Sequence, residues 1–350
     1  MSLPPDAVAC PVPRTESERV LLAHGEGGRL MRRLIRDLLL PRLDNAALRP
    51  LADGAVLPSL AGQLVLSTDS YVVSPLFFPG GDIGKLAVHG TVNDLAVCGA
   101  RPLYFTLGLI LEEGLTLDTL RQVLESVGEA ARACGVHVVT GDTKVVPRGA
   151  ADGLFLNTTG VGELRPGCVL AAEQVLPGDC VLVSGTLGDH GIAVLAAREH
   201  LDLGPRVMSD TAPLQELVAL LLDDGVRVRF LRDATRGGVA AVLHEMAESA
   251  AVSVLVEEAA LPVSEAVRGA CEILGLDPLH VANEGKLVAV VAAEDAGRAL
   301  ALMRGHRLGA AAAIIGEVRS RDLTPVQVRG LLGALRMLDE PAGAPLPRIC

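Results

Sequence analysis

The stretch that decides the fold runs from residue 67 to residue 100 and reads STDSYVVSPLFFPGGDIGKLAVHGTVNDLAVCGA. Its first residues end the predicted strand LVLSTD at Asp69, and its second half, from Gly84, is typical of a helix closed by Gly99. A turn rich in glycine and proline separates the two. A strand that passes through such a turn into a helix indicates an α/β protein.

The same alternation of strand and helix extends to both sides of this stretch. Before it, GGRLMRRLIRDLLL repeats apolar pairs at helical spacing, which predicts an amphipathic helix ended by Pro41. After it, the first half continues as strand, helix, strand and strand, with the strand VHVVT running into GDTK. The second half repeats the pattern from CVLVSG, and its last predicted strand is AAIIGEV. The fold class predicted is therefore α/β, or α+β.

The length of the chain predicts two domains. At 350 residues the chain is too long for one core of ordinary size. We expect a first domain over residues 21–163 and a second over 164–337. A flexible extension, 1–20, precedes them, and a flexible tail without periodicity, 338–350, follows.

Charge, hydropathy and cysteine spacing exclude several classes of protein. The net charge of −11, with acidic and basic residues mixed along the chain, argues against a nucleic-acid partner. No apolar run reaches the roughly 18 residues of a membrane span, and the N-terminus lacks the features of a secretory signal. Seven cysteines without a CxxC pair argue against a disulfide framework and a zinc ribbon. We therefore expect a cytoplasmic protein.

Acidic side chains at the ends of predicted elements indicate a site for Mg²⁺ and a nucleotide. Oxygen ligands that converge from separate turns are what Mg²⁺ needs when it also holds phosphates. In this sequence the candidates are Asp69, Asn93, Asp94 and Asp142, with Lys85 and Lys144 beside them. The alternative is that these acidic residues cap helices or solvate turns.

The segment PGGDIGKL is not a Walker A loop. That motif needs a glycine five residues before the Gly-Lys pair and Ser or Thr after the lysine, whereas these positions hold Pro79 and Leu86. Glycines at a helix N-terminus can still bind phosphate through free backbone N–H groups. A plain glycine turn is the alternative.

Polar turns in the second half supply further candidates. RDATRGG places Asp233, Thr235 and Arg236 before two glycines at a helix start, which fits either a phosphate or substrate contact or an ordinary cap. The turn ANEGK carries Glu284, whose carboxylate is either solvated or a general base. His190 in LGDHG fits a structural turn histidine better than a catalytic one.

The chain ends in APLPRIC, with a cysteine as its last residue. Its prolines keep this segment out of helices and central strands, so it is either a swinging arm or a frayed terminus. The ten residues after Glu340 reach about 33 Å when extended, which would cross a domain. The α-carboxylate of Cys350 should hold the pKa of its thiol up, which favours a group carrier over a self-activated nucleophile.

Several stretches together resemble one family. Residues 67–100, GDTKVV, SGTLGDHG, LRDATRGGV, ANEGKLV and the terminal PRIC are similar to the HypE family of [NiFe]-hydrogenase maturation proteins. This family lies in the superfamily of aminoimidazole ribonucleotide synthetase and selenophosphate synthetase. The similarity spans nearly the whole chain from Leu22 to Cys350, and the terminal motif is specific to the family within the superfamily. The resemblance implies a two-domain PurM-like fold: an N-terminal domain for ATP binding and dimerisation, a C-terminal α/β domain and a flexible tail.

The resemblance also implies an activity and its partners. Cys350 is expected to receive a carbamoyl group from the carbamoyltransferase HypF. ATP-dependent dehydration of the resulting S-carboxamide is then expected to give a thiocyanate, whose cyano group passes to iron held by HypC and HypD. A homodimer formed through the first domains is expected, with the nucleotide near the interface.

The expected cofactors are ATP and Mg²⁺, and the resemblance gives roles to residues singled out above. Lys144 is expected to steady the oxygen that is phosphorylated, and Glu284 to remove a nitrogen proton. The expected metal ligands are Asp69, Asp94 and Asp142. The residues expected to bind the nucleotide are Asp69, Lys85, Asn93, Asp94, Asp142 and Arg236.

Two other classes of protein remain as alternatives. A small-molecule kinase of the selenophosphate-synthetase kind carries a reactive cysteine or selenocysteine near its N-terminus. Cys10 lies there, but without a glycine-rich loop around it. A non-enzymatic scaffold, whose tail only docks partners, would tolerate loss of the acidic residues, whereas an ATP-dependent dehydratase would not.

Overall fold

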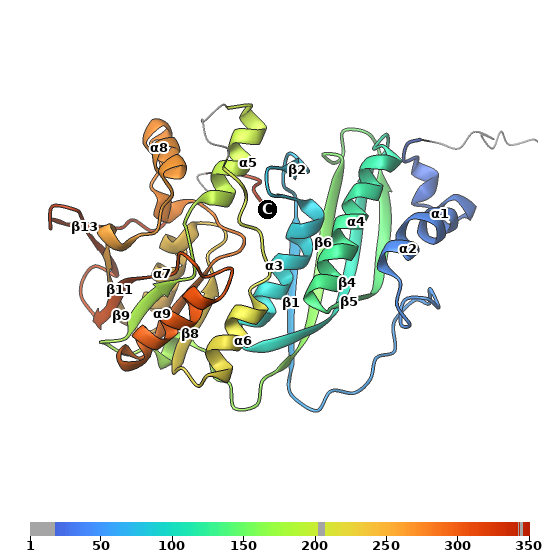
Figure 1. Ribbon diagram of the computed structural model, residues 1–350. Coiled ribbons are helices and arrows are strands. Elements are labelled where there is room, and N and C mark those ends of the chain that lie inside the picture. The colour runs from blue at the N-terminus through green and yellow to red at the C-terminus, as the bar shows by residue number, and fades with distance from the viewer. Residues whose placement is uncertain (1–17, 202–206, 342, 344–345) are drawn as a thin grey trace, which may run out of the picture.

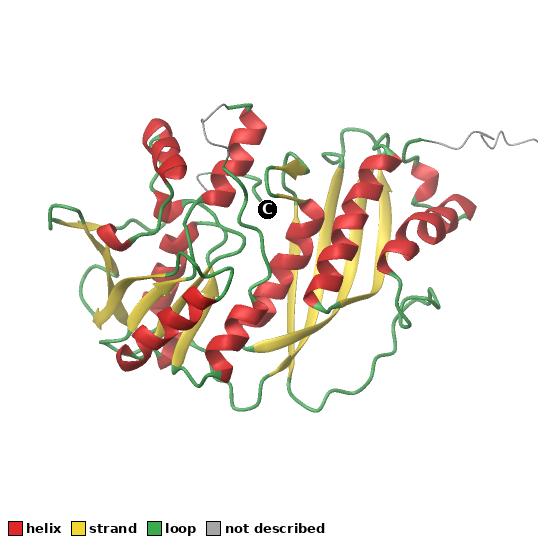
Figure 2. Cartoon of the chain, viewed as in Figure 1, coloured by secondary structure: helices red, strands yellow, loops and turns green. Residues whose placement is uncertain are grey.

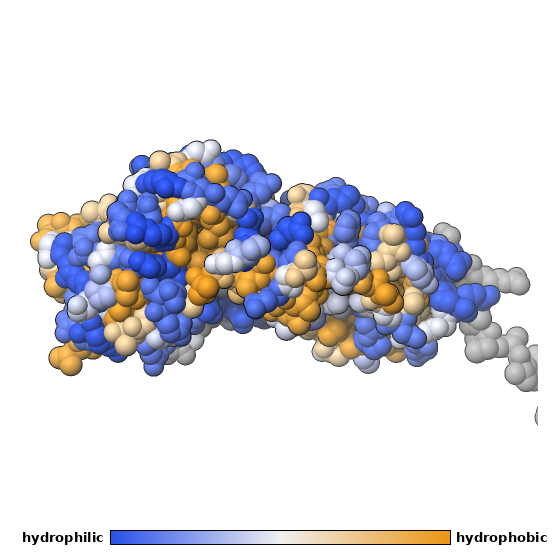
Figure 3. Space-filling model, turned by 90° about the horizontal axis from the view of Figure 1, so that it is seen from below, coloured by the Kyte–Doolittle hydropathy of each residue, from blue (hydrophilic) through white to orange (hydrophobic). Residues whose placement is uncertain are grey.

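The computed structural model describes residues 18–201, 207–341, 343 and 346–350. Most of the predicted extension 1–20, including Cys10, therefore lies outside the described residues. The chain forms two lobes, seen side by side in Figure 1 and from below in Figure 3, with apolar side chains exposed on both. In the described part of the chain no helix is both long and apolar enough to span a membrane.

The first lobe is a four-stranded sheet with helices on one face (Figures 1 and 2). The strand order is β1-β6-β4-β5, antiparallel except for the parallel pair β4 and β5. These strands are β1 (Leu64–Tyr71), β4 (Ala100–Glu112), β5 (His137–Val146) and β6 (Leu154–Leu164). The helices on the sheet are α3 (Ile83–Val97) and α4 (Leu117–Cys134), and a small hairpin of β2 (Phe77–Phe78) and β3 (Gly81–Asp82) precedes α3.

The predicted first helix is longer and less regular than expected. It begins as α1 (Arg29–Leu34), widens into a π-helical turn, η2 (Ile35–Leu39), and continues as α2 (Leu40–Leu43). The prediction that Pro41 ends the helix is therefore wrong. The helix continues past Pro41 to Leu43 after a π-helical turn in which the N–H of Leu40 bonds to the carbonyl of Ile35, five residues back, so the regular pattern that a proline interrupts is already changed there.

The second lobe is a seven-stranded mixed sheet in the order β13-β12-β9-β11-β7-β10-β8. Its strands are β7 (Cys180–Val183), β8 (Val228–Asp233), β9 (Val252–Glu257), β10 (Leu287–Val291), β11 (Ala313–Ser320), β12 (Val326–Arg329) and β13 (Leu335–Met337). Its helices are α5 (Asp189–Glu199), α6 (Gln215–Asp223), α7 (Gly238–Ser249), α8 (Glu265–Leu274) and α9 (Ala296–Gly305). Short 3-10 turns are η1 (Leu22–His24), η3 (Ala172–Gln174), η4 (Glu258–Ala260), η5 (Pro278–His280) and η6 (Ala293–Asp295). The final strands β12 and β13 have no counterpart in the sequence prediction.

Alternation along β1 sends its side chains to opposite faces of the first sheet. Asp69 aligns across the sheet with Thr158, Leu107 and Gly141, on the face that α3 and α4 cover. The neighbouring residues of β1 point to the other face of the sheet. No described residue covers that face, and Leu66, which lies on it, is 64% exposed. Asp69 therefore points from β1 toward α3, at the junction between the lobes.

Helix α3 joins the two lobes. Its residues from Ile83 to Leu95 contribute to the core under the first sheet, whereas Ala96 and Val97 belong to a core cluster with α6 and α9 of the second lobe. The C-terminus returns to this junction and ends between α5 and the α3 region (Figure 1). The N–H of Val72, just after β1, donates to the backbone oxygen of Cys350 at 3.0 Å, so the chain ends beside the end of β1.

Candidate active site

Four carboxyl groups gather at the junction of the lobes. Asp69 comes from β1, Asp94 from the last turns of α3, Asp233 from the end of β8, and Glu284 from the turn before β10. Each of the last three has its pKa raised in part by another member of this group. We call these four residues the cleft carboxylates.

Burial and mutual repulsion raise the pKa values of Asp94, Asp233 and Glu284. Desolvation is the largest cause for Asp94, whose pKa rises to about 6 despite a hydrogen bond from Ser67 Oγ (2.5 Å) and with a further contribution from Asp69. Desolvation and the charge of Asp94 raise the pKa of Asp233 to about 7. The arrangement concentrates more negative charge than the protein itself neutralises, which favours binding of a cation.

Glu284 is held by its backbone on both sides while its side chain remains buried. Its N–H donates to Asp210 Oδ1 (2.9 Å), and its carbonyl accepts from Asn93 Nδ2 (3.2 Å). Asp210 is itself paired with Lys286 at 3.1 Å. Only 3% of Glu284 is exposed, and desolvation, followed by the charge of Asp233, raises its pKa well above the ordinary value. The backbone of Glu284 is therefore fixed in place, and burial disfavours the ionised form of its carboxyl group.

Asn93 uses its amide group to join α3 to the second lobe. Besides the bond to Glu284, its Nδ2 donates to the carbonyl of Ala212 (3.1 Å), and its Oδ1 accepts from the N–H of Leu214 (2.7 Å). The side chain is buried and both amide hydrogens are used. This geometry positions Glu284, and the role of Asn93 as a nucleotide ligand stays a prediction.

The thiol of Cys350 lies among these groups. Desolvation is the largest cause that raises its pKa, to about 12; the charges of Glu284 and Asp69 also raise the pKa, and that of Arg236 lowers it. The terminal residue is half-buried. A docked thiol of this kind is protonated and a poor nucleophile at neutral pH.

Asp142 and Lys144 lie apart from the cleft carboxylates within one chain. They are on β5, the strand at the opposite edge of the first sheet from β1, and they pair with each other at 3.0 Å. Asp142 aligns with Gly108, Asn157 and Ser70, so it is on the open face of the sheet, whereas Asp69 is on the covered face. A single chain does not bring the two sets together.

Lys85 and Arg236 differ in their relation to the site. Arg236, after β8, is exposed and acts on both Glu284 and Cys350 through its charge. Lys85 lies in the first turn of α3, where its charge acts on His89. The N-terminus of α3 is capped by Asp82, whose Oδ1 accepts from the N–H groups of Gly84 and Lys85. These N–H groups are thus already satisfied by a carboxylate, which favours the plain glycine turn over a phosphate cradle.

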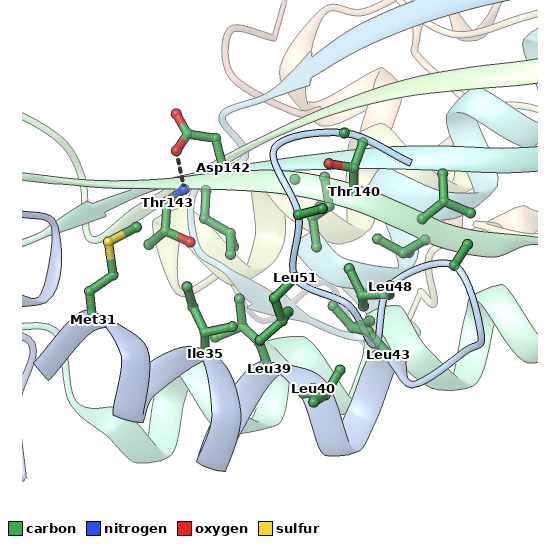
Figure 4. A pocket seen from close by; sticks show the side chains of 18 residues that line it. Met31, Ile35, Leu39, Leu40, Leu43, Leu48, Leu51, Thr140, Asp142 and Thr143 are labelled. Atoms are coloured by element: carbon green, nitrogen blue, oxygen red, sulfur yellow. Dashed lines mark hydrogen bonds between the residues drawn. The ribbon is translucent and has the colours of Figure 1, made fainter. Parts of the chain in front are cut away.

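An apolar cavity of about 150 Å³ lies between the first helical segment and the strands β4 and β5 (Figure 4). Met31, Ile35 and Leu39 line it on the helical side, and Leu51 lies in the loop beyond (Figure 4). Asp142 stands at its edge, with Oδ1 accepting from the N–H of Thr143 at 2.9 Å. The carboxylate of Asp142 points away from the apolar lining (Figure 4), in keeping with its position on the open face of the sheet.

The residues that the structure describes form no closed metal centre of their own. Among them no group of three or more His, Cys, Asp or Glu side chains lies close enough together to hold a metal ion. A closed protein cage is therefore absent from the described part of the chain. The unneutralised cleft carboxylates instead fit Mg²⁺, which takes one or two carboxylates and completes its shell with phosphate oxygens and water.

Sequence reasoning missed several residues of this site. Asp210 and Asn283 hold the Glu284 turn, and Tyr71, with its hydroxyl 3.4 Å from Asp69, closes the covered face of β1. Arg198 contacts the tail. The dipeptides around Asp210 and Asn283 carried a weak turn signal, but nothing in the sequence near Arg198 separates it from any exposed arginine on a helix.

The chain matches two halves of one known family. Residues 51–164 match AIR synthase related protein, N-terminal domain, and residues 177–329 match AIR synthase related protein, C-terminal domain. The carbamoyl dehydratase HypE of Cupriavidus necator is 50% identical to the chain over 336 residues, which cover 96% of each protein.

Solved structures agree in fold over nearly the whole chain. A hydrogenase maturation protein HypE in complex with ATP has a TM-score of 0.91 and 48% identity, and the match covers 94% of this chain and 99% of that one. A chain of a HypE–HypF complex has a TM-score of 0.78 and 46% identity, covering 88% and 99%. The two-domain PurM-like fold expected from the sequence is thereby confirmed.

Proposed function

The chain belongs to the HypE family of carbamoyl dehydratases, and from this premise we propose that it dehydrates a carbamoyl group carried on its own Cys350. ATP is the second substrate, as a HypE relative binds it. The observation that carries the proposal is the docked position of the terminal residue: the N–H of Val72 donates to the backbone oxygen of Cys350 at 3.0 Å, and His190 Nε2 donates to the carbonyl of Ile349 at 2.7 Å. The chemistry serves hydrogenase maturation, in which the cyano group becomes an iron ligand.

The reaction balances in two steps. The carboxamide oxygen attacks the γ-phosphorus of ATP, the bond to the bridging oxygen breaks and ADP leaves, while the nitrogen loses its first proton. Loss of the second nitrogen proton then forms the C≡N bond as the carbon–oxygen bond breaks and phosphate departs, which leaves S–C≡N on Cys350. Glu284, fixed at both sides of its backbone, is the group that accepts a nitrogen proton. Arg236 supplies the positive charge that favours its ionised form.

Mg²⁺ is the metal that fits the carboxylates present. Asp69 and Asp94 would hold it in the cleft, and it would neutralise charge on the phosphates being transferred. The pKa values raised by mutual repulsion in this cluster are what supports this proposal, because a bound cation relieves that repulsion.

A second copy of the chain supplies Asp142 and Lys144. These residues face away from the cleft carboxylates of their own chain, on an open sheet face that also exposes Leu64 and Leu66. Packing two such faces in a homodimer buries this apolar surface and places β5 of one chain near the junction of the other. Lys144 then steadies the oxygen that is phosphorylated in the partner's site.

The apolar cavity beside Asp142 takes the adenine base. A flat, largely apolar ring system fits a cavity lined by Ile35, Leu39 and Leu43, with the phosphates directed past Asp142 toward the second copy. HypF is the carbamoyl donor, in line with the solved HypE–HypF complex. A HypC–HypD complex is the acceptor of the cyano group.

Intact mass spectrometry tests the function. The chain is incubated with HypF, carbamoyl phosphate and Mg-ATP and compared with Cys350→Ala. A Cys350-dependent gain of about 25 Da, the cyano group replacing the thiol hydrogen, supports the dehydratase. A gain of about 43 Da that persists in the presence of Mg-ATP identifies a carbamoyl carrier that does not dehydrate the group. No gain in mass would favour the small-molecule kinase or the scaffold instead.

A further inference from the structure

Arg198, near the end of α5, binds the tail and the loop beside it with one guanidinium group. Its Nη1 donates to the carbonyl of Pro347 at 2.6 Å, and its Nη2 to the carbonyl of Arg348 at 2.5 Å. Its Nε donates to the carbonyl of Ser74 at 2.8 Å. The donors of a guanidinium lie in one rigid plane, so these three bonds fix the distance between the two segments.

The remaining tail carbonyls are bound in the same way. The N–H of Val72 donates to an oxygen of the terminal carboxylate of Cys350 at 3.0 Å. His190 Nε2 donates to the carbonyl of Ile349 at 2.7 Å, while its Nδ1 lies 2.8 Å from Ser209 Oγ. The histidine pKa is lowered by burial, so the ring is neutral, and the bond to Ile349 fixes the Nε2–H tautomer. Each of the last four residues thus has its carbonyl bound.

Apolar side chains complete the docking. Leu346 is 6% exposed and Ile349 is 3% exposed, and both belong to a core cluster that contains residues of both lobes. Arg348 points outward and pairs with Asp152 at 2.8 Å. Neither the hydrogen bonds above nor these side-chain contacts use the sulfur of Cys350.

We propose that Arg198 is a positioning residue of the reaction. It binds the tail through backbone oxygens, holds Cys350 at the cleft carboxylates whatever group the sulfur carries, and thereby withholds the thiol from the carbamoyl donor. The hydrogen bonds of Arg198 are made only to backbone carbonyl groups, so a carboxamide on the sulfur leaves them intact. This inference rests on the proposed function for its catalytic consequence and on the geometry alone for its effect on thiol access.

The two chemical steps place opposite demands on the tail. Dehydration takes place at the cleft and needs the tail docked. Carbamoylation is performed by another protein and needs the thiol released, because the docked thiol is half-buried. Loss of Arg198 should therefore slow dehydration and speed carbamoylation, whereas a general folding defect would slow both steps.

Thiol access is measured first, without any partner protein. Wild type, Arg198→Ala and Arg198→Lys are alkylated with iodoacetamide, and the rate at Cys350 is followed by peptide mass spectrometry. Cys98, an exposed cysteine at the end of α3, serves as the internal reference. Arg319→Ala, which removes another arginine whose partner is Glu317, is the matched control. We expect about a tenfold faster alkylation of Cys350 in Arg198→Ala, with an intermediate rate in Arg198→Lys and no change in the control.

The two steps of the reaction are then compared. Pre-carbamoylated Arg198→Ala given Mg-ATP should form thiocyanate about tenfold more slowly than wild type, and HypF should carbamoylate the unmodified variant at least as fast as wild type. An unchanged alkylation rate would overturn the positioning role. So would equal losses in both steps. If wild type itself never forms thiocyanate while Arg198→Ala still exposes Cys350, the proposed function fails and the tail contact stands.

Discussion

Cys350 meets the body of the protein through its α-carboxylate as well as through its thiol. The carboxylate accepts from the N–H of Val72, and the preceding carbonyls accept from Ser74, His190 and Arg198. These bonds fix the backbone of residues 348–350, and with it the position of Cys350. A cysteine one position earlier or later would place its sulfur elsewhere relative to Glu284.

A variant with one glycine added after Cys350 tests whether these bonds position the cysteine. The added residue removes the carboxylate from Val72 and must fit into a buried space, so we expect thiocyanate formation to fall about tenfold or more. Carbamoylation by HypF should persist, since that step uses the released tail. Intact mass spectrometry of both steps gives the answer, and full dehydration activity in the extended chain would show that the terminal carboxylate is not recognised.

Glu284→Gln separates chemistry from stability. The folded protein raises the pKa of Glu284, so above the unfolded pKa of about 4.5 the carboxyl group takes up a proton on folding at a cost that grows with pH. Glutamine resembles the protonated form and avoids that cost. The urea midpoint of the variant should equal or exceed that of wild type at pH 7.5, while dehydration is lost. A lower midpoint at pH 7.5 would mean that Glu284 is ionised and paired in the folded protein.

The sequence patterns identified the charged residues of the site but not their arrangement in space. Asp69, Asp94 and Glu284 stood at the ends of predicted elements and do lie together. Asp142 shares the composition of that set, yet it is on the opposite sheet face, and only the register of β5 reveals this. The contribution of Arg198 depends on the three-dimensional path of the tail, which no local pattern contains.

Helix α3 links the lobes through polar contacts as well as packing. His89 lies in its middle, 8% exposed, with Nδ1 3.3 Å from Thr211 Oγ1 of the second lobe. Desolvation, with the positive charges of Lys85 and Arg307, lowers its pKa from 6.5 to about 4. The junction is therefore built around a neutral imidazole.

The protonation of His89 should weaken the protein in mild acid. Its folded pKa is depressed, so its neutral form is fully compatible with the fold above pH 6.5, and stability falls as the pH drops from 6.5 toward 4. At pH 5 the loss is about 2 kcal/mol. Urea unfolding at pH 7.5 and pH 5 should show this loss in wild type and a smaller one in His89→Gln. Equal acid sensitivity of the two proteins would exclude His89 as its source.

The order of helices and strands could be read from the sequence where apolar periodicity was strong. Helix α4, with a cap at Thr116 and a left-handed Gly135 after its end, follows the predicted pattern closely. Strand β13 could not be predicted, because it is wholly exposed at the sheet edge and has no burial pattern, whereas β12 does alternate in burial and was missed because it is only four residues long. Pro41 misled the prediction because the π-helical turn before it, which no periodicity announces, lets the helix run on for two more residues.

The open sheet face of the first lobe decides whether one chain is enough for the reaction. Leu64 and Leu66 are 63% and 64% exposed on it, and Lys144 shares it. In a homodimer through this face, each site combines Glu284 of one chain with Lys144 of the other. In a monomer, Lys144 would have no route to the cleft across the sheet.

Mixing two inactive variants distinguishes these arrangements. Lys144→Ala and Glu284→Gln each disable both sites of their own homodimer, but a mixed dimer has one site with both wild-type residues. Random reassortment should therefore restore about a quarter of wild-type dehydration per chain. The variants are carbamoylated, mixed under conditions that exchange subunits, and given Mg-ATP, and thiocyanate is counted by intact mass. Leu66→Asp, introduced into both chains, should abolish the recovery by charging the shared face. No recovery in mixtures whose exchange is confirmed would place Lys144 and Glu284 in the same chain's site and overturn the shared one.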